Sequence, residues 1–334
     1  MGERQQHLST RSIQTYQRNE QRQGALEQAL ITMQLTNNSN LPTPVVAAVR
    51  RSMREYDAGG SNRTITQIID SPRKVALERG REDEVVVDVV DQIAPLIGTA
   101  LHKLAQLGAD SAHIAEERIF INIDGWKISG QIDLQRIDED GFMAYDYKYT
   151  GTGSLSNGEP KSEWVNQANA YAYLIEKTKG IPCKGLFVVA FLRDRNRARA
   201  ENDPNYPQAD AVLIPLPMWS FEDQETYVLE RVRLHKEAFR RLTFGEELPL
   251  CTDEERWKRQ DKWALMKEGR KSAVKLYDSS EEAYVNAVSY NGKEALKKKS
   301  KHYVEHRPGE TIRCNNYCPV QGWCDQFKRE VEEA

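Results

Sequence analysis

Two carboxylates and an ammonium group stand in two neighbouring stretches of the sequence, ISGQIDL and FMAYDYKYT. Each stretch is rich in apolar and aromatic residues, and Asp140-Gly141 between them is a hairpin signature, so we predict two paired strands. Asp146 and Lys148 are two residues apart and share one face of their strand, while Asp133 lies in the strand before. Such a set can hold a hard divalent cation against a phosphodiester and direct a water molecule at it.

Each of these residues also has an ordinary structural explanation. A single Asp in a strand usually marks a turn or an edge, and the Asp-X-Lys pattern is common on protein surfaces. Two ionised groups on a buried strand face are costly, however, unless a function keeps them there. The combination therefore favours a functional site.

Two further motifs carry polar groups that fit the same chemistry. His102 stands in GTALHKL, on an otherwise apolar predicted helix. A buried structural histidine is the usual case there, but imidazole is also a common metal ligand. Gln167 and Tyr171 are four residues apart in QANAY, so one helical face presents both to a phosphate or a base. A surface glutamine and a half-buried tyrosine are the alternative for this pair.

Hydrophobic periodicity indicates the elements that position these groups. Strands are predicted at about 117–123, 126–137 and 142–149, then in GLFVVAFLRD and ADAVLIPLP. Helices are predicted over about 161–178 and 220–242, and upstream over about 83–107 with an interruption near Pro95. From Leu248 onward the sequence has little strand character. This order predicts a mixed α/β sheet flanked by helices, with an N-terminal helical arm (1–60), a core (61–247) and a cysteine-bearing subdomain (248–334).

Composition narrows the possible functions. The 334 residues are 29% charged and 39% hydrophobic, with a net charge of −3. This charge excludes a protein that binds nucleic acid through an overall positive charge, so any phosphate binding must come from local basic patches. No apolar run approaches the ~20 residues of a membrane span, and the N-terminus lacks the apolar core of a signal peptide. We therefore expect a cytoplasmic protein. In that compartment its five cysteines indicate metal or redox chemistry rather than disulfides.

The cysteines are concentrated near the C-terminus. Cys314, Cys318 and Cys324 lie within CNNYCPVQGWC, where a proline and a glycine bend the loop, and this grouping indicates a metal site. A fourth ligand must come from elsewhere. Cys183 borders a predicted central strand and fits a core position, so we choose Cys251. Zinc is the rival metal, although zinc ribbons usually have paired Cys-x-x-Cys motifs, which are missing here.

The motifs together resemble those of a known family. Four of them occur in the order and approximate spacing of the RecB-type branch of the PD-(D/E)XK nuclease superfamily, and the resemblance covers about residues 64–195: His102, Gly130-Gln131-Ile132-Asp133, Asp146-Tyr147-Lys148 and Gln167 to Tyr171. The resemblance implies a restriction-endonuclease-like mixed sheet flanked by helices.

The resemblance also implies a role for each residue. His102, Asp133 and Asp146 would bind Mg²⁺ or Mn²⁺, with the backbone carbonyl of Tyr147 completing the shell. Lys148 would orient the attacking water or stabilise the developing charge. Glu117 would add a direct or outer ligand, or else form a surface salt bridge. Gln167 and Tyr171 would hold the scissile strand.

The C-terminal cysteines resemble those of the AddB nuclease domain and of CRISPR-associated adaptation nucleases. Those proteins hold a [4Fe–4S] cluster with one upstream cysteine and three near the C-terminus. The resemblance implies a structural cluster here on Cys251 and the three C-terminal cysteines. The chain departs from the pattern upstream, where Ser71-Pro72 stands in place of the family's Cys-Pro. The fourth ligand would then come from the other side of the nuclease core.

These implications converge on a metal-dependent exonuclease acting on single-stranded DNA or DNA ends, in recombination, repair or phage DNA metabolism. Lysines at 297–301 and alternating arginines at 193–199 are possible DNA contacts, and the N-terminal arm could recruit a helicase, a recombinase or a second copy. Alternatives are a CRISPR-adaptation-like nuclease that trims DNA, a catalytically silent DNA-binding module, and a zinc-stabilised RNA-processing protein.

Overall fold

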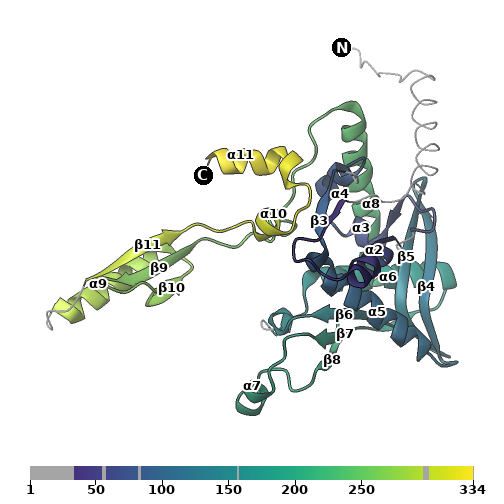
Figure 1. Ribbon diagram of the computed structural model, residues 1–334, viewed down its shortest axis with the longest axis horizontal. Coiled ribbons are helices and arrows are strands. Elements are labelled where there is room, and N and C mark those ends of the chain that lie inside the picture. Colours follow the sequence, from purple (N-terminus) through teal and green to yellow (C-terminus); the bar gives the residue numbers. More distant parts are fainter. Residues whose placement is uncertain (1–33, 55–57, 82–83, 156–157, 296–300, 334) are drawn as a thin grey trace. The chain divides into compact units, whose positions relative to one another are not determined.

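The computed structural model describes residues 34–54, 58–81, 84–155, 158–295 and 301–333 (Figure 1). The chain divides into two compact units, Met1–Leu248 and Pro249–Ala334. Residues 1–33, the larger part of the expected N-terminal arm, and Lys297, Lys298 and Lys299 lie outside the described residues. Among the described helices, none has the length and apolar character needed to cross a bilayer.

A six-stranded mixed sheet forms the centre of the first unit. Its strand order is β2-β5-β6-β7-β8, and β4 pairs with the other edge of β5. The parallel pairs are β2 with β5 and β6 with β7. The strands are β2 (Arg63–Thr64), β4 (His113–Ile123), β5 (Trp126–Asp138), β6 (Gly141–Thr150), β7 (Cys183–Leu192) and β8 (Ala211–Pro215).

The turn between β4 and β5 explains why these strands form a tight hairpin. Asp124 and Gly125 both have positive φ, 47° and 80°. Left-handed conformations at both central residues belong to the type I′ turn, whose twist matches that of the flanking strands, and Asp-Gly is a favoured sequence for it. The long β5 is thereby paired with β4 from Trp126 to Arg136.

Helices cover the sheet on both faces. Against one face, α6 (Ser162–Lys179), α8 (Phe221–Phe244) and α3 (Ile65–Ile68) enclose the main apolar core. The approach of α6 is close, because a Cβ on Gly130 would lie 2.9 Å from the Tyr171 ring. A larger residue at position 130 would therefore push α6 away. The predicted fold class, a mixed α/β sheet flanked by helices, is confirmed.

The helix predicted over 83–107 is shorter than expected. Val86–Asp88 is a strand, β3, parallel to β1 (Gln34–Thr36), and a 3₁₀ turn follows at Val89–Gln92 before α5 (Ile93–Leu107) begins. Pro95 therefore falls in the first turn of α5. A first-turn N–H has no partner within the helix, so proline is tolerated there and does not interrupt it.

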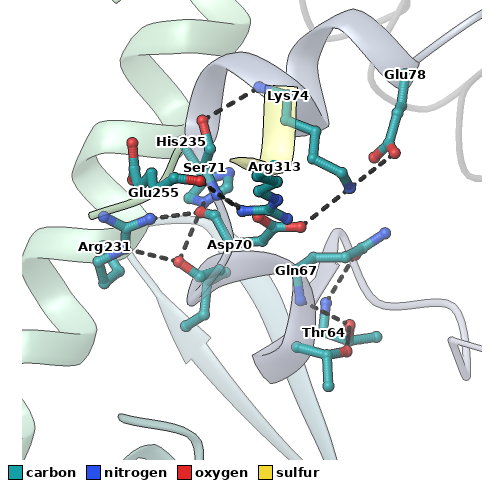
Figure 2. A network of polar contacts seen from close by, with 12 residues as sticks. Thr64, Gln67, Asp70, Ser71, Lys74, Glu78, Arg231, His235, Glu255 and Arg313 are labelled. Atoms are coloured by element: carbon teal, nitrogen blue, oxygen red, sulfur yellow. Dashed lines mark hydrogen bonds and ion pairs between the residues drawn. The ribbon is translucent and has the colours of Figure 1, made fainter. Parts of the chain in front are cut away.

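A buried polar network joins α8 to the segment between α3 and α4 (Pro72–Glu78) (Figure 2). The Nε2 atom of His235 lies 3.1 Å from the carbonyl oxygens of both Ile68 and Asp70, and Arg231 donates to the same two carbonyls. Ser71 caps α4 by accepting a hydrogen bond from the Lys74 backbone N–H. The long helix thus satisfies carbonyls that the broken α3–α4 backbone leaves unpaired.

This network predicts acid sensitivity. Burial, reinforced by the charges of Arg231 and Arg63, lowers the pKa of His235 to about 3. In the unfolded chain this histidine becomes protonated as the pH falls through its ordinary pKa of 6.5. In the folded chain it stays neutral until a far lower pH. Stability is complete above about pH 6.5 and falls below it by up to about 1.4 kcal/mol per pH unit. Urea unfolding should show this loss between about pH 6.5 and 5, and His235→Gln, although less stable at neutral pH, should show a smaller pH dependence. An equal pH dependence in both proteins would contradict this.

The second unit contains a small sheet that was not expected. Strands β9 (Lys262–Lys267), β10 (Lys275–Tyr277) and β11 (His302–Arg307) pair in the order β10-β9-β11, and α9 (Ser280–Ala295) packs on them. Trp263 packs against this small core. The unit ends with α10 (Ile312–Asn316), a 3₁₀ turn (Gln321–Trp323) and α11 (Asp325–Glu333).

Candidate active site

The candidate site lies where two strands diverge. Along one edge of β5, the pairing with β6 ends at Leu134 and Tyr145, and the next residues on each strand are Asp133 and Asp146. Beyond this point β5 pairs with β2, from Ser129, and β6 runs on beside β7. The Tyr147 N–H donates to Asp133 Oδ2 at 2.7 Å. The fork therefore gathers both carboxylates where backbone groups are no longer committed to the sheet.

Three side chains from three elements converge beside this fork. His102 of α5, Glu116 of β4 and Asp133 of β5 each place one ligand atom within 4.8 Å of the other two. His102 Nδ1 lies 3.2 Å from Glu116 Oε1 and 3.4 Å from Asp133 Oδ1. The aromatic ring of Tyr147 meets the imidazole edge-on. One imidazole and two carboxylates at this spacing are a donor set that divalent cations accept.

Glu116, rather than Glu117, joins this group. The β4–β5 register pairs Ala115 with Leu134 and Glu117 with Ile132, which leaves Glu116 opposite Asp133. Glu117 instead accepts hydrogen bonds from Gln135 Nε2 at 2.6 Å and from Lys179 of α6. The alternation of Ile119, Ile121 and Ile123 could have shown this, because odd-numbered residues of β4 face the α6 side.

Burial and the repulsion between like charges dominate the electrostatics of the two aspartates. Burial, and then the charge of Asp146, raises the pKa of Asp133 to about 8. Burial lowers the pKa of His102, but its hydrogen bond to Glu116 and the charge of Asp133 raise it on balance above the ordinary value. A bound divalent cation would relieve both effects and would release a proton from Asp133 at neutral pH.

The surroundings of Asp146 also favour a bound cation. Its carboxylate is buried, and Oδ2 lies 2.7 Å from Lys148 Nζ, with which it forms an ion pair. Within the described residues no other group donates to this oxygen. Two buried carboxylates, Asp133 and Asp146, beside a single ammonium group are costly unless a further cation compensates their charge. The residues present therefore fit a divalent cation.

Lys148 heads a short hydrogen-bonded chain into α6. Its Nζ donates to Gln167 Oε1 at 2.9 Å, and Gln167 Nε2 donates to the Tyr171 hydroxyl at 3.0 Å. Gln167 and Tyr171 are buried. In this structure the pair therefore orients the ammonium group, and the expected contact with a scissile strand stays a prediction.

Exposed arginines lie just beyond the same end of the sheet. Thr150 of β6 lies beside Leu192 of the parallel β7, and Arg193 follows immediately. Arg193, Arg197 and Arg199 are exposed, whereas the Arg195 guanidinium binds the carbonyls of Pro207 and Gln208 and the Asp210 carboxylate. Parallel strands end at the same edge, so the exposed arginines follow the strand end that carries Lys148.

Among the described residues, no disulfide bond joins the cysteines of the second unit. Burial and the neighbouring Cys318, with a further contribution from Cys324, raise the pKa of Cys314, so the three C-terminal thiols are near enough to interact electrostatically. Cys251 is held at the start of α11, because Gln326 accepts from its N–H at 2.8 Å and donates to its C=O at 3.1 Å. The fifth cysteine, Cys183, lies on β7 in the first unit.

The family model of the PD-(D/E)XK nuclease superfamily matches residues 62–325. The chain belongs to the PD-(D/E)XK nuclease superfamily. The match spans both the candidate site and the cysteine-bearing segment. No curated protein matches the chain.

Solved structures resemble this superfamily member in part. The crystal structure of SSO0001 is 16% identical with a TM-score of 0.40, over 64% of this chain and 87% of that chain. An alkaline exonuclease from Laribacter hongkongensis is 14% identical with a TM-score of 0.34, over 55% of this chain and 91% of that chain. That exonuclease has also been solved in complex with dAMP.

Proposed function

We propose that this chain is a divalent-metal-dependent deoxyribonuclease of the RecB type, an exonuclease that acts on single-stranded DNA or DNA ends in recombination, repair or phage DNA metabolism. A cytoplasmic location is part of the proposal. The observation that carries it is the meeting of His102, Glu116 and Asp133 beside the β5–β6 fork, next to Asp146 and Lys148.

Each residue has a role that its surroundings support. His102, Asp133 and Asp146, joined by Glu116 and the Tyr147 carbonyl, would hold Mg²⁺ or Mn²⁺. When bound, the cation supplies Lewis acidity and an activated water. Lys148, oriented by Gln167, would hold that water or offset the charge that develops on the phosphate. The exposed Arg193, Arg197 and Arg199 would bind the DNA backbone.

We further propose that Cys251, Cys314, Cys318 and Cys324 hold a [4Fe–4S] cluster. Two features support a shared site: the mutual influence of the C-terminal thiols, and the hydrogen bonds from Gln326 that fasten the Cys251 backbone to α11. The cluster would join the beginning of the second unit to its end and would contribute stability rather than chemistry.

A comparison of nucleic-acid substrates tests the activity. End-labelled single-stranded DNA, duplex DNA and RNA are incubated with the full chain in Mn²⁺ or in EDTA. We expect DNA to be shortened from its ends with Mn²⁺, and no cleavage in EDTA. Closed circular single strands should survive. Cleavage of RNA alone, or activity in EDTA, would contradict the proposal.

A further inference from the structure

A line of polar side chains leads away from the candidate metal group along β4 and β5. Gln131 Nε2 donates to Glu116 Oε2 at 2.6 Å, and Glu116 offers its other oxygen to His102. Arg118 donates to Gln131 Oε1, and its second terminal nitrogen donates to Ser129 Oγ at 3.3 Å. The line therefore runs from Ser129 through Arg118 and Gln131 to the ligand carboxylate.

Arg118 decides which way the Gln131 amide points. A guanidinium can only donate, so the Gln131 oxygen must face it and the Gln131 nitrogen must face Glu116. The Gly59 backbone lies close against the Arg118 side chain, because a Cβ at position 59 would lie 2.9 Å from Arg118 Cδ. The Glu116 carboxylate is thus held by the Gln131 amide, whose orientation is set by Arg118.

The backbone of Glu116 supports a functional reason for this arrangement. Its φ of 55° lies in the left-handed region, which side chains other than Asn and Asp seldom adopt. Strained conformations of this kind persist where neighbouring interactions hold them, and they cluster at functional sites. Here the held residue is the one that faces His102.

The same two strands contain a matched pair without a metal group. Gln135 donates to Glu117 at 2.6 Å, the same interaction at the same distance, but Glu117 is bound by Lys179 instead of facing His102. Gln135 is fully buried. If the Gln–Glu contact only stabilised the fold, the loss of either glutamine should have the same kind of effect.

We propose that Arg118 and Gln131 are positioning residues that aim the Glu116 carboxylate at the divalent cation. This inference rests on the proposed function, because it assumes that the His102 group binds metal. Neither positioning residue touches the cation. Each acts through Glu116, and removing either one leaves the carboxylate free to turn away from the cation.

Mn²⁺ binding to the full chain, measured by titration calorimetry and electron paramagnetic resonance, tests this. We expect Gln131→Leu to weaken Mn²⁺ binding about tenfold, as loss of an outer-shell partner typically does, and Arg118→Gln to weaken it in the same direction. Gln135→Leu should lower the unfolding temperature without changing Mn²⁺ affinity. In a Glu116→Gln background, Gln131→Leu should have no further effect, because its route to the metal is gone.

Three results would overturn the inference: unchanged Mn²⁺ affinity in Gln131→Leu, an equal loss of affinity in Gln135→Leu and Gln131→Leu, or full additivity of Gln131→Leu with Glu116→Gln. Asp133→Asn separates this from failure of the proposed function. If Asp133→Asn abolishes Mn²⁺ binding while Gln131→Leu leaves it intact, only the positioning role fails. If Asp133→Asn also binds Mn²⁺ like the native chain, the metal site itself is wrong.

Discussion

Replacing Asp146 with asparagine is expected to abolish Mn²⁺-dependent DNA cleavage while leaving the fold intact. The Asp146 carboxylate is buried at the β5–β6 fork, next to Asp133 and paired with Lys148. Asparagine keeps the shape of the side chain but removes the charge that the cation requires. Losing several kcal/mol of charge stabilisation in the transition state corresponds to a rate loss of about 10³-fold or more.

The metal-free protein should tolerate this change. The charge of Asp146 contributes to the raised pKa of Asp133, so its removal lowers that pKa, although burial keeps it above the ordinary value. Lys148 loses an ion pair but retains Gln167 as a hydrogen-bond partner. We therefore expect an unfolding temperature close to that of the native chain.

Asp140→Asn is a suitable control, because Asp140 is an exposed carboxylate in the turn that joins the same two strands. Single-turnover cleavage of end-labelled single-stranded DNA at saturating Mn²⁺ should be unaffected by it. If Asp146→Asn retained more than a small fraction of the native rate under these conditions, the role assigned to Asp146 would be wrong.

The parts of the site that sequence analysis could reach are those set by local patterns. Asp146 and Lys148 were predicted to share a strand face, and their side chains form an ion pair. The hairpin between β5 and β6 was also expected, although its central residues are Glu139 and Asp140 because Asp138 pairs with Gly141. Alternation and turn chemistry depend on adjacent residues, so the sequence carries them directly.

What escaped prediction depends on the register between strands, which decides the residues that lie opposite each other across the sheet. Glu116 enters the site because β4 pairs with β5 in a register that sets it opposite Asp133, and a one-residue slip would have presented Glu117 instead. The three short strands of the second unit were missed because their burial alternates little: Leu265 and Tyr277 face α9, but Ala264 and Met266 of β9 are buried as well. A core this small produces only a weak hydrophobic periodicity in the sequence.

An anaerobic preparation of the native chain is expected to be brown and to contain about four irons and four sulfides per chain. Cys324→Ala should be colourless and should lose that iron. Cys324 is buried, and it immediately precedes α11, whose Gln326 binds the Cys251 backbone. Absorption spectra, together with iron and sulfide analysis of both proteins, measure this.

Cys183→Ala is the matched control, because Cys183 is the one cysteine outside the proposed set. Its Sγ lies 3.8 Å from the Gly185 carbonyl, and burial raises the pKa of this thiol to about 11, so it stays protonated and is a poor ligand. The variant should keep its colour and its iron. Loss of the cluster in Cys324→Ala should also expose the second unit to proteolysis, because a metal that joins both ends of a small unit supplies much of its folding free energy. A colourless native protein with stoichiometric zinc would keep this argument for a structural metal but would contradict iron, since thiolate sites of four sulfurs accept either.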